Sequence, residues 1–464
     1  MRYLHELGGI MLKSKIQTGY ISELEKVYIF TYDGELLQLV PKEKNEIKPY
    51  DFLNNSNKNL EILEGETQAG NKIFFLNCRL LVRESGYIAR PAGFILCDHD
   101  LDMFDTITFK SGIIDFFYRT NQIIDEKESY CNYQSGESMV KLKGFADTTE
   151  HYDVFIAEKK ADLCLSITQP GLPLDFTIGY SLGRPKSTLM LTFENPVSIS
   201  EFRSIYLWIY NLMIFLNFRR DVFMGEITLG RLTDDKRNEK IADTYILEKN
   251  KAEIENVDRI IGYVFIEEKI DQLLKIVNKP ELNLLFIPKN CKEGKYLTPE
   301  KYMICCTSFE SVFNFVFPNA RTEYSQVANE VKQEFLDYIS DRDEAYKGKS
   351  KKKRQEFQKY ADMITFLDFG LGEKFSYCEK EYGCLITEYK KQLLLAQNMK
   401  EEQLDEMAYA FGKKRNMLMH NSLEPFESVH VVAYSLARVF IYIMIMKKAG
   451  ICDQMIIQAI DKVL

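Results

Sequence analysis

The sequence predicts an α+β protein in which an antiparallel β-rich half precedes an all-helical half. Two observations indicate this order. Short β-branched and aromatic runs, separated by turn residues, fill residues 11–191. From residue 256 onward, apolar residues instead recur at helical spacing. Because the strand runs follow one another without alternating helices, an antiparallel sandwich or barrel is favoured over a parallel sheet.

The strands of the first half are predicted from β-branched and aromatic runs with turn residues beside them. Asp33-Gly34 and Ala69-Gly70-Asn71 can adopt the positive φ angles of tight turns, so each should connect two neighbouring strands. The clearest predicted strands are residues 27–31, 73–76, 79–82, 107–109, 153–157 and 189–193.

A helix should follow these strands, beginning at Ser200-Glu201, before strand-like sequence resumes and continues to about Leu247. Its predicted buried face is one apolar stripe at helical spacing. The stripe consists of Ile205, Trp208, Ile209, Leu212 and Leu216.

The second half should begin with a loop at residues 288–294 and a helix at Thr298-Pro299-Glu300. Threonine is a good N-cap residue, and proline is well suited to the first helical position. Further helices are predicted at residues 328–342, 355–367, 384–396, 400–420, 428–448 and 452–463.

A chain of 464 residues is too long for one ordinary core. We therefore predict a β-rich domain at residues 1–250, a helical connector at 251–298 and a helical domain at residues 299–464.

The composition limits the classes of partner. With 60 Lys and Arg against 68 Asp and Glu, the net charge is −8, so any contact with nucleic acid must be a local basic patch. The ten cysteines show no zinc-ligand spacing, and we expect reduced thiols, no cofactor and a cytoplasmic protein. The apolar stretches 205–218 and 439–446 are too short to span a bilayer, so no membrane contact is expected.

One short segment near the C-terminus carries a candidate for chemistry. Arg415 and Asn416 are adjacent, and His420 follows at the predicted end of a helix. An arginine and a histidine at this spacing are common by chance, but the asparagine and the helix-end position make the pattern more specific. The alternative is a solvated helix end whose cations lie near the carbonyl end of the helix dipole.

These residue types suit metal-free RNA cleavage, in which the ribose 2′-OH attacks the adjacent phosphorus. Histidine can move a proton near neutral pH, and arginine can stabilise the charge that builds on the phosphate oxygens. Asn416 and His420 are four residues apart and share a helix face, whereas Arg415 lies on the adjacent face. One helix would therefore supply half of a site, which a symmetric dimer would complete.

The C-terminal part resembles an ApeA-like HEPN domain of bacterial abortive-infection proteins. The residues that carry the resemblance are Lys413-Lys414-Arg415-Asn416, His420-Asn421 and the earlier helix from Cys305-Cys306 to Val312-Phe313, which includes Glu310. The N-terminal half resembles the β-rich leading domain of that family at Leu63-Glu64-Gly65, Gly70-Asn71-Lys72-Ile73 and Leu76-Asn77-Cys78.

The resemblance implies an antiphage ribonuclease that cleaves host RNA once infection triggers it, with tRNA as a candidate substrate. Arg415, Asn416 and His420 take the catalytic places, and Glu310 takes a supporting place, pairing with Arg415 or Lys414. It also implies that residues 1–250 are a sensor or regulatory domain and that residues 299–464 are the ribonuclease domain. A homodimer joined through the helical domain is implied as well, with a phage protein as candidate trigger at the N-terminal domain.

Two groups of basic residues are candidates for RNA binding. Lys413 and Lys414 flank the catalytic segment, and Lys351, Lys352, Lys353 and Arg354 belong to the densest positive run of the chain. The alternative for this run is a solvated loop between helices.

Other patterns point to weaker candidates. Asp153, Glu158 and Lys160 imitate the carboxylates and lysine of magnesium-dependent nucleases. Gly370-Leu371-Gly372 is more typical of an interhelical turn than of a phosphate-binding loop. His430 could reach the catalytic groove, although a histidine satisfied within its own helix is the simpler interpretation.

Two functions of another class remain open. The helical domain could be a non-catalytic dimerisation or binding module, combined with a β-rich domain that recognises a ligand or protein. Alternatively, the β-rich half could be a carbohydrate or peptide receptor, with the helices as scaffold. Replacing His420 separates both from a nuclease, since only a nuclease depends on that side chain.

Overall fold

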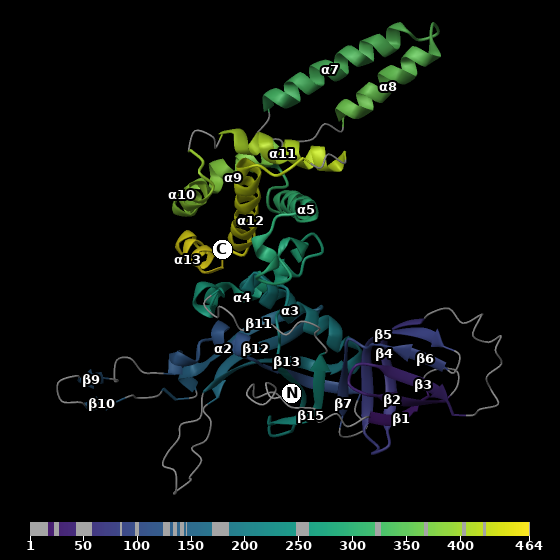
Figure 1. The fold of residues 1–464 in the computed structure, drawn as a ribbon, viewed down its shortest axis with the longest axis vertical. Coiled ribbons are helices and arrows are strands. Elements are labelled where there is room, and N and C mark those ends of the chain that lie inside the picture. Colours follow the sequence, from purple (N-terminus) through teal and green to yellow (C-terminus); the bar gives the residue numbers. More distant parts are fainter. Residues whose placement is uncertain are drawn as a thin grey trace. The chain divides into compact units, whose positions relative to one another are not determined.

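The structure of the chain is a computed structural model. It describes residues 17–22, 27–42, 58–83, 86–97, 102–123, 130–132, 137–139, 143–144, 146–168, 185–246, 259–320, 326–365, 370–400, 405–420 and 424–463. The chain forms two compact units, residues 1–275 and 276–464, and their boundary falls inside the predicted connector. The first is β-rich and the second is helical, so the predicted α+β class is confirmed (Figure 1).

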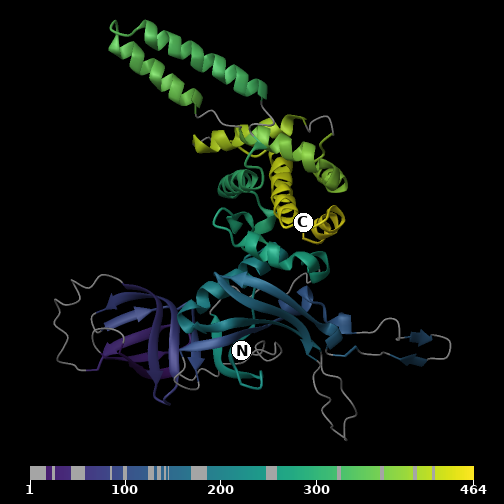
Figure 2. The ribbon, with the colours of Figure 1, turned by 180° about the vertical axis from the view of Figure 1, so that it is seen from behind.

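The first six described strands form a closed antiparallel barrel (Figures 1 and 2). Around the barrel, hydrogen bonding follows the order β5-β4-β1-β2-β3-β6, and β6 returns to β5. The strands are β1 (Gln17–Ile21), β2 (Tyr28–Tyr32), β3 (Leu37–Pro41), β4 (Lys58–Thr67), β5 (Lys72–Arg83) and β6 (Gly86–Ala89).

Alternating side chains fill the barrel, as expected for strands with one buried face. The ring of Phe75 meets the rings of Phe30 and Tyr32 edge-on, at centroid distances of 5.4 and 5.3 Å. The barrel closes at Gly86, where a Cβ atom would lie 1.8 Å from the Leu39 carbonyl oxygen. Only glycine permits this close approach of β6 to β3.

The predicted strands at residues 73–76 and 79–82 are in fact one strand, β5. Asn77 lies between them with a left-handed backbone (φ 50°), a conformation that asparagine tolerates better than most residues. The first part of β5 pairs with β7 (Gly93–Cys97) and its last part pairs with β6. The two predicted turns are confirmed, since Gly34 and Gly70 have positive φ angles between paired strands.

From β7 the hydrogen bonding continues into an open antiparallel sheet in the order β7-β15-β14-β8-β13-β12-β11. The other predicted strands lie in it or in the barrel. Helix α3 buries four of the five residues of the predicted stripe, and the fifth, Trp208, is half-buried. The elements are β8 (Met103–Lys110), α2 (Gly112–Phe117), β11 (Thr149–Ile156), β12 (Lys159–Thr168), β13 (Lys186–Ser198), α3 (Phe202–Asn217), β14 (Glu226–Leu232) and β15 (Asn238–Ile246), with a separate pair β9 (Tyr130–Asn132) and β10 (Glu137–Met139).

The second unit is a helical bundle around α12, which packs against α5, α9, α11 and α13. Its helices match the predicted ones to within a few residues, except α9, and Thr298 caps α5 as predicted by accepting from the Lys301 amide at 3.3 Å. The helices are α4 (Ile270–Val277, at the unit boundary), α5 (Pro299–Val316), α7 (Gln326–Ala345), α8 (Lys351–Thr365), α9 (Leu371–Tyr382), α10 (Thr387–Ala396), α11 (Asp405–Met419), α12 (Ser428–Lys448) and α13 (Asp453–Val463).

Helix α9 was not predicted, because Gly370-Leu371-Gly372 indicated a turn. Gly370 is the N-cap residue, but Leu371 and Gly372 already belong to the helix. The buried residues Phe375, Cys378 and Tyr382 recur at helical spacing and could have revealed it.

The sequence predicts no membrane-spanning segment here, because the apolar stretch 439–446 is too short. Helix α12, which contains this stretch, is longer. Its length and composition would allow it to cross a membrane. However, 72% of its most apolar window is buried inside the structure, as in the core helix of a bundle.

Candidate active site

The candidate site lies at the C-terminal end of α11, a helix that one buried stripe holds in place. Met407, Phe411 and Lys414 are buried at positions i, i+4 and i+7. Phe411 contacts Phe309 of α5 and Phe375 of α9, at centroid distances of 5.8 and 5.2 Å. The end of α11 is therefore supported by two neighbouring helices.

Arg415 and Asn416 lie in the last turns of α11, and His420 directly follows the helix, as the sequence predicts. The His420 amide donates to the carbonyl oxygens of Asn416 and Met417, both at 3.2 Å, so the backbone is still wound at this residue. The side chains of Asn416 and His420 are exposed, and helical spacing places them away from the stripe that includes Phe411.

Arg415 connects the buried and exposed sides of the helix end. Its side chain is half-buried, and its Nη1 atom donates to the Asn416 Oδ1 atom at 3.2 Å. Its charge also acts on Cys306 of α5: burial raises the pKa of that thiol, and Arg415 opposes the increase. Arg415 therefore acts electrostatically on α5 while its side chain binds the exposed Asn416 amide.

Lys414, predicted to bind RNA, is instead 1% exposed. Its Nζ atom donates to the carbonyl oxygens of Glu424 and Pro425, at 2.8 and 3.1 Å, and lies 5.0 Å from the Phe426 ring centroid. The ammonium group therefore satisfies two backbone carbonyl groups in the segment that leads into α12. It is not exposed where a phosphate could bind.

Lys413 remains a candidate RNA contact beside the site. Its side chain is exposed, and its ammonium lies 5.5 Å from the centroid of the exposed Tyr409 ring. A cation and an aromatic face close together suit contact with a phosphate and a base.

The predicted pairing of Glu310 with Arg415 or Lys414 is wrong. Glu310 on α5 forms a 2.8 Å ion pair with Lys374 of α9, whose side chain is 6% exposed. The pair joins two helices that also support α11. Sequence reasoning missed Lys374 because α9 itself was not predicted.

His430 is satisfied within its own helix, the simpler of its two interpretations. Its Nδ1 atom accepts from the Glu427 amide at 3.0 Å at the start of α12. Burial, followed by the positive charge of Lys414, lowers the pKa of His430 below its ordinary value. A neutral ring is the form that can accept this hydrogen bond.

Helices α9 and α11 meet with almost no space between their backbones at Gly372. A Cβ atom on this residue would lie 2.7 Å from the Ala408 carbonyl oxygen of α11. Glycine at this position therefore sets the distance between α11 and the helix that carries Lys374.

We expect Gly372→Ala to destabilise the chain by about 1–3 kcal/mol, the usual cost of overpacking. The loss should be visible as a lower thermal midpoint. Gly294→Ala is the control, because its Cβ atom would make only an ordinary 3.5 Å contact with Pro288. Equal midpoints for the two variants would contradict the close packing of α9 on α11.

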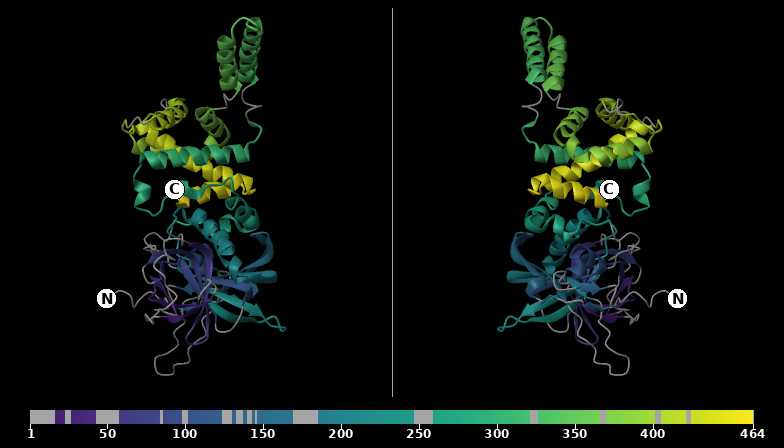
Figure 3. Two further views of the ribbon diagram at one scale, coloured as in Figure 1. Left: turned by 90° about the vertical axis from the view of Figure 1, so that its right-hand side faces the viewer. Right: turned by 90° about the vertical axis from the view of Figure 1, so that its left-hand side faces the viewer.

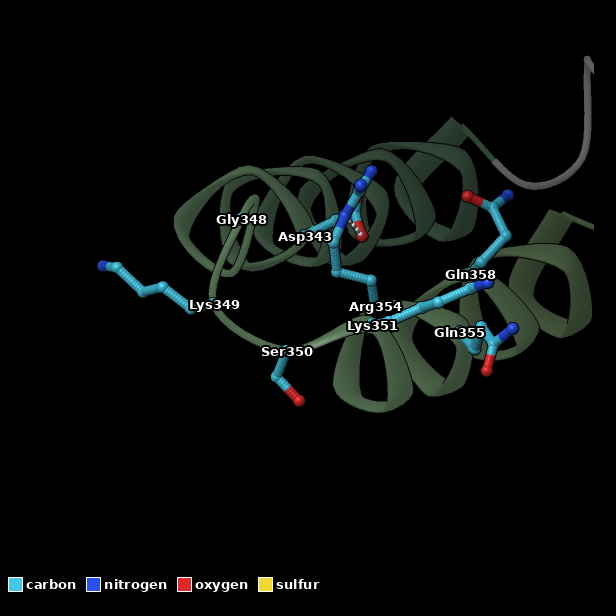
Figure 4. A pocket seen from close by; sticks show the side chains of 8 residues that line it. All are labelled: Asp343, Gly348, Lys349, Ser350, Lys351, Arg354, Gln355 and Gln358. Carbon is cyan, nitrogen blue, oxygen red and sulfur yellow. Dashed lines mark hydrogen bonds and ion pairs between the residues drawn. The ribbon is translucent and has the colours of Figure 1, made fainter.

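The second basic group lies at the tip of a helical hairpin formed by α7 and α8 (Figure 4). Helix α8 begins earlier than predicted, so Lys351, Lys352, Lys353 and Arg354 form its first turn and are not a loop. The tip borders a shallow cavity of about 500 Å³.

Two of these four basic side chains already have partners. Arg354 forms a bidentate pair with Asp343, at 2.9 and 2.8 Å, and Lys353 lies 4.6 Å from the Tyr346 ring centroid. Lys351 and Lys352 are exposed and remain the better RNA-binding candidates of the group.

The three residues of the alternative candidate, a magnesium-dependent nuclease site, are not arranged to hold a metal. Asp153 lies on β11, Glu158 in the following turn with a positive φ angle, and Lys160 on β12, 3.8 Å from Glu194. In the described part of the chain, no group of three His, Cys, Asp or Glu side chains is arranged to hold a metal.

A polar cavity of about 400 Å³ lies on one face of the open sheet. Its lining is rich in hydroxyl groups and includes two lysines. The cavity could not be predicted from local sequence patterns, because its residues come from five separate strands. The lining residues include Thr108, Lys110, Ser166, Thr168, Thr188, Glu226, Thr228, Asn238 and Lys240.

Comparisons with protein-family models, with curated proteins and with solved structures found no match to this chain. The functional assignment therefore depends on the residues and on the geometry described above.

Proposed function

We propose that the chain is a metal-independent endoribonuclease that acts as a homodimer, with Arg415, Asn416 and His420 as its catalytic residues. The observation that carries the proposal is their placement at one supported helix end. The side chains of Asn416 and His420 are exposed there and that of Arg415 is half-buried, whereas the stripe behind them is buried.

The proposed reaction forms a bond between the ribose 2′-oxygen and phosphorus and breaks the bond to the 5′-oxygen. The products are a 2′,3′-cyclic phosphate and a 5′-hydroxyl. His420 moves the proton, because an exposed imidazole can exchange protons near neutral pH. Arg415 stabilises the phosphorane, and Asn416 orients the phosphate or the ring.

The dimer follows from the incomplete site on each helix. One copy supplies one histidine, while proton removal from the 2′-OH and proton donation to the leaving oxygen are two separate tasks. A two-fold axis beside α11 would bring a second His420 and a second Arg415 to the same groove.

The resemblance to abortive-infection proteins extends the proposal to the biological role of the chain, which is defence against phage. In that proposal the nuclease is held inactive until a phage component reaches the β-rich unit, and it then cleaves host RNA. The polar cavity of the open sheet is a candidate ligand site, which also supports the second candidate function, a ligand-recognition domain joined to a non-catalytic bundle.

The test is cleavage of total bacterial RNA by the purified chain in EDTA, with chemical analysis of the fragment ends. Fragments ending in 2′,3′-cyclic phosphate are the expected result, and sequencing them would identify the substrate. Strict dependence on Mg²⁺ would contradict the proposal. If the purified chain does not cleave RNA, the assay is repeated with lysate from phage-infected cells, which supplies the proposed trigger. No cleavage with the lysate either would favour the non-catalytic binding module.

A further inference from the structure

The hairpin of α7 and α8 presents an unusual outer face. The two helices lie side by side along their length (Figure 3) and, among the described elements, pack substantially only against each other. Ile339 is the one residue classed as buried among the described side chains of the hairpin. Six large apolar side chains are between 43% and 71% exposed: Val327, Val331, Phe335, Tyr338, Tyr360 and Met363.

These six side chains form one surface. On α7 the exposed residues recur at i, i+4, i+8 and i+11, which is a single helical stripe. It is rotated by about 100° from the side that meets α8, which is marked by the buried Ile339 and by Asp343, the partner of Arg354. On α8, Tyr360 and Met363 are rotated by a similar angle from the side that meets α7. Because the helices run antiparallel, the two rotations bring both stripes to the same face, here called the hairpin face.

The two helices carry opposite charge. Helix α7 has six acidic and two basic side chains, whereas α8 has five basic and two acidic ones. Acidic residues near the C-terminus of α7 and basic residues at the N-terminus of α8 both oppose the helix dipoles. Local helix stability therefore does not explain this distribution, which suits pairing between helices.

We propose that the hairpin face binds the hairpin face of a second copy of this chain, forming an antiparallel four-helix bundle. A two-fold axis parallel to the helices would place α7 of each copy against α8 of the other. In this arrangement the acidic α7 of each copy faces the basic α8 of the other, so the bundle contains two such pairs of oppositely charged helices. The other face-to-face two-fold, perpendicular to the helices, would place acidic α7 against acidic α7 and is disfavoured.

The geometry also names the ion pairs. In the proposed bundle, exposed carboxylates along the outer edge of the α7 stripe meet exposed lysines along the outer edge of the α8 stripe. The tips of the two hairpins lie at the same end, and the Asp343–Arg354 pair sets the register of each hairpin. By that register, Asp341 lies about one helical turn from the level of Lys352 of the other copy, and Glu334 lies about one turn from the level of Lys359, an offset that a long lysine side chain can span.

The available area fits a reversible dimer. Helices of 20 and 15 residues are about 30 and 22 Å long and about 10 Å wide, so the hairpin face offers roughly 500 Å². Two such faces bury roughly 1,000 Å² in total, near the lower limit for a specific interface. The occupant is therefore a second hairpin and not a much larger surface.

The test compares two charge-reversed forms of the full chain by sedimentation over a concentration series. One carries Lys352→Glu and Lys359→Glu on α8; the other carries Glu334→Lys and Asp341→Lys on α7. Each alone should associate at least tenfold more weakly than the wild type, because it opposes like charges twice. An equal mixture of the two should associate again, since each variant then complements the other.

Every other outcome overturns the proposal. Association unchanged in both variants would place the contact elsewhere, including at the proposed nuclease dimer around α11, which these substitutions do not touch. A loss confined to one of the two variants would show that the contact uses only one of the two helices. Two weakened variants that fail to recover on mixing, or an α8 variant that loses only RNA binding, would indicate another partner.

Discussion

Replacing His420 with alanine should reduce RNA cleavage in EDTA by about 10²- to 10⁴-fold, the range expected when a general acid or base is lost. The effect should be chemical and not structural, because the side chain is exposed at a helix end. Surface substitutions of this kind usually change the free energy of unfolding by less than about 0.5 kcal/mol. Cleavage rate and thermal midpoint should be measured on the same preparation.

Met419→Ala is the matched control for this experiment. Met419 is adjacent to His420, ends the same helix and is 58% exposed, but it has no group that can move a proton. It should retain the wild-type cleavage rate. If His420→Ala cleaves as fast as the control, His420 is not the proton-transfer group.

Replacing Glu310 with alanine should destabilise the helical unit by about 2–3 kcal/mol. Removing one partner of a buried ion pair typically costs 3–5 kcal/mol, because the remaining charge is left unpaired. Lys374 would be that charge, with a side chain that is 6% exposed, while the 37% exposure of Glu310 moves the expected cost to a lower value. The loss should be measured by denaturant unfolding. Equal unfolding midpoints for the variant and the wild type would contradict a stabilising Glu310–Lys374 ion pair.

The double variant Glu310→Ala, Lys374→Met separates a supporting role from a catalytic one. Removing both charges leaves nothing unpaired, so stability should return at least half-way. Cleavage per folded molecule should be near wild type in both variants at 25 °C. A loss of cleavage that persists in the double variant would show that the Glu310 carboxylate takes part in the reaction.

The two-part organisation could be predicted from the sequence because it depends on local periodicity. Helix α12 was predicted with its exact bounds, and Thr298 with its capping role. The closed barrel could not be distinguished from a sandwich, because closure depends on β6 returning to β5, a pairing that the strand patterns do not encode. The polar residue Asn77 made one strand resemble two for the same reason: local breaks in a pattern do not reveal whether hydrogen bonding continues.

The candidate site could likewise be predicted only in part from the sequence. The positions of Arg415, Asn416 and His420 at a helix end follow from spacing, and the structure places them there. Long-range partners do not follow from spacing. Lys414 was expected to face RNA but is buried against carbonyl oxygens ten and eleven residues later, and Glu310 pairs with a lysine 64 residues away. Neither contact could be inferred from the sequence before the fold was known.

The pairing of strand β5 has a consequence for how the β-rich unit unfolds. It hydrogen-bonds to β7 of the open sheet through its first residues and to β6 of the barrel through its last, so the two substructures share one backbone. Neither can lose β5 without opening the other. We therefore expect the barrel and sheet to melt in a single cooperative transition and to exchange their central amide hydrogens together, as one foldon.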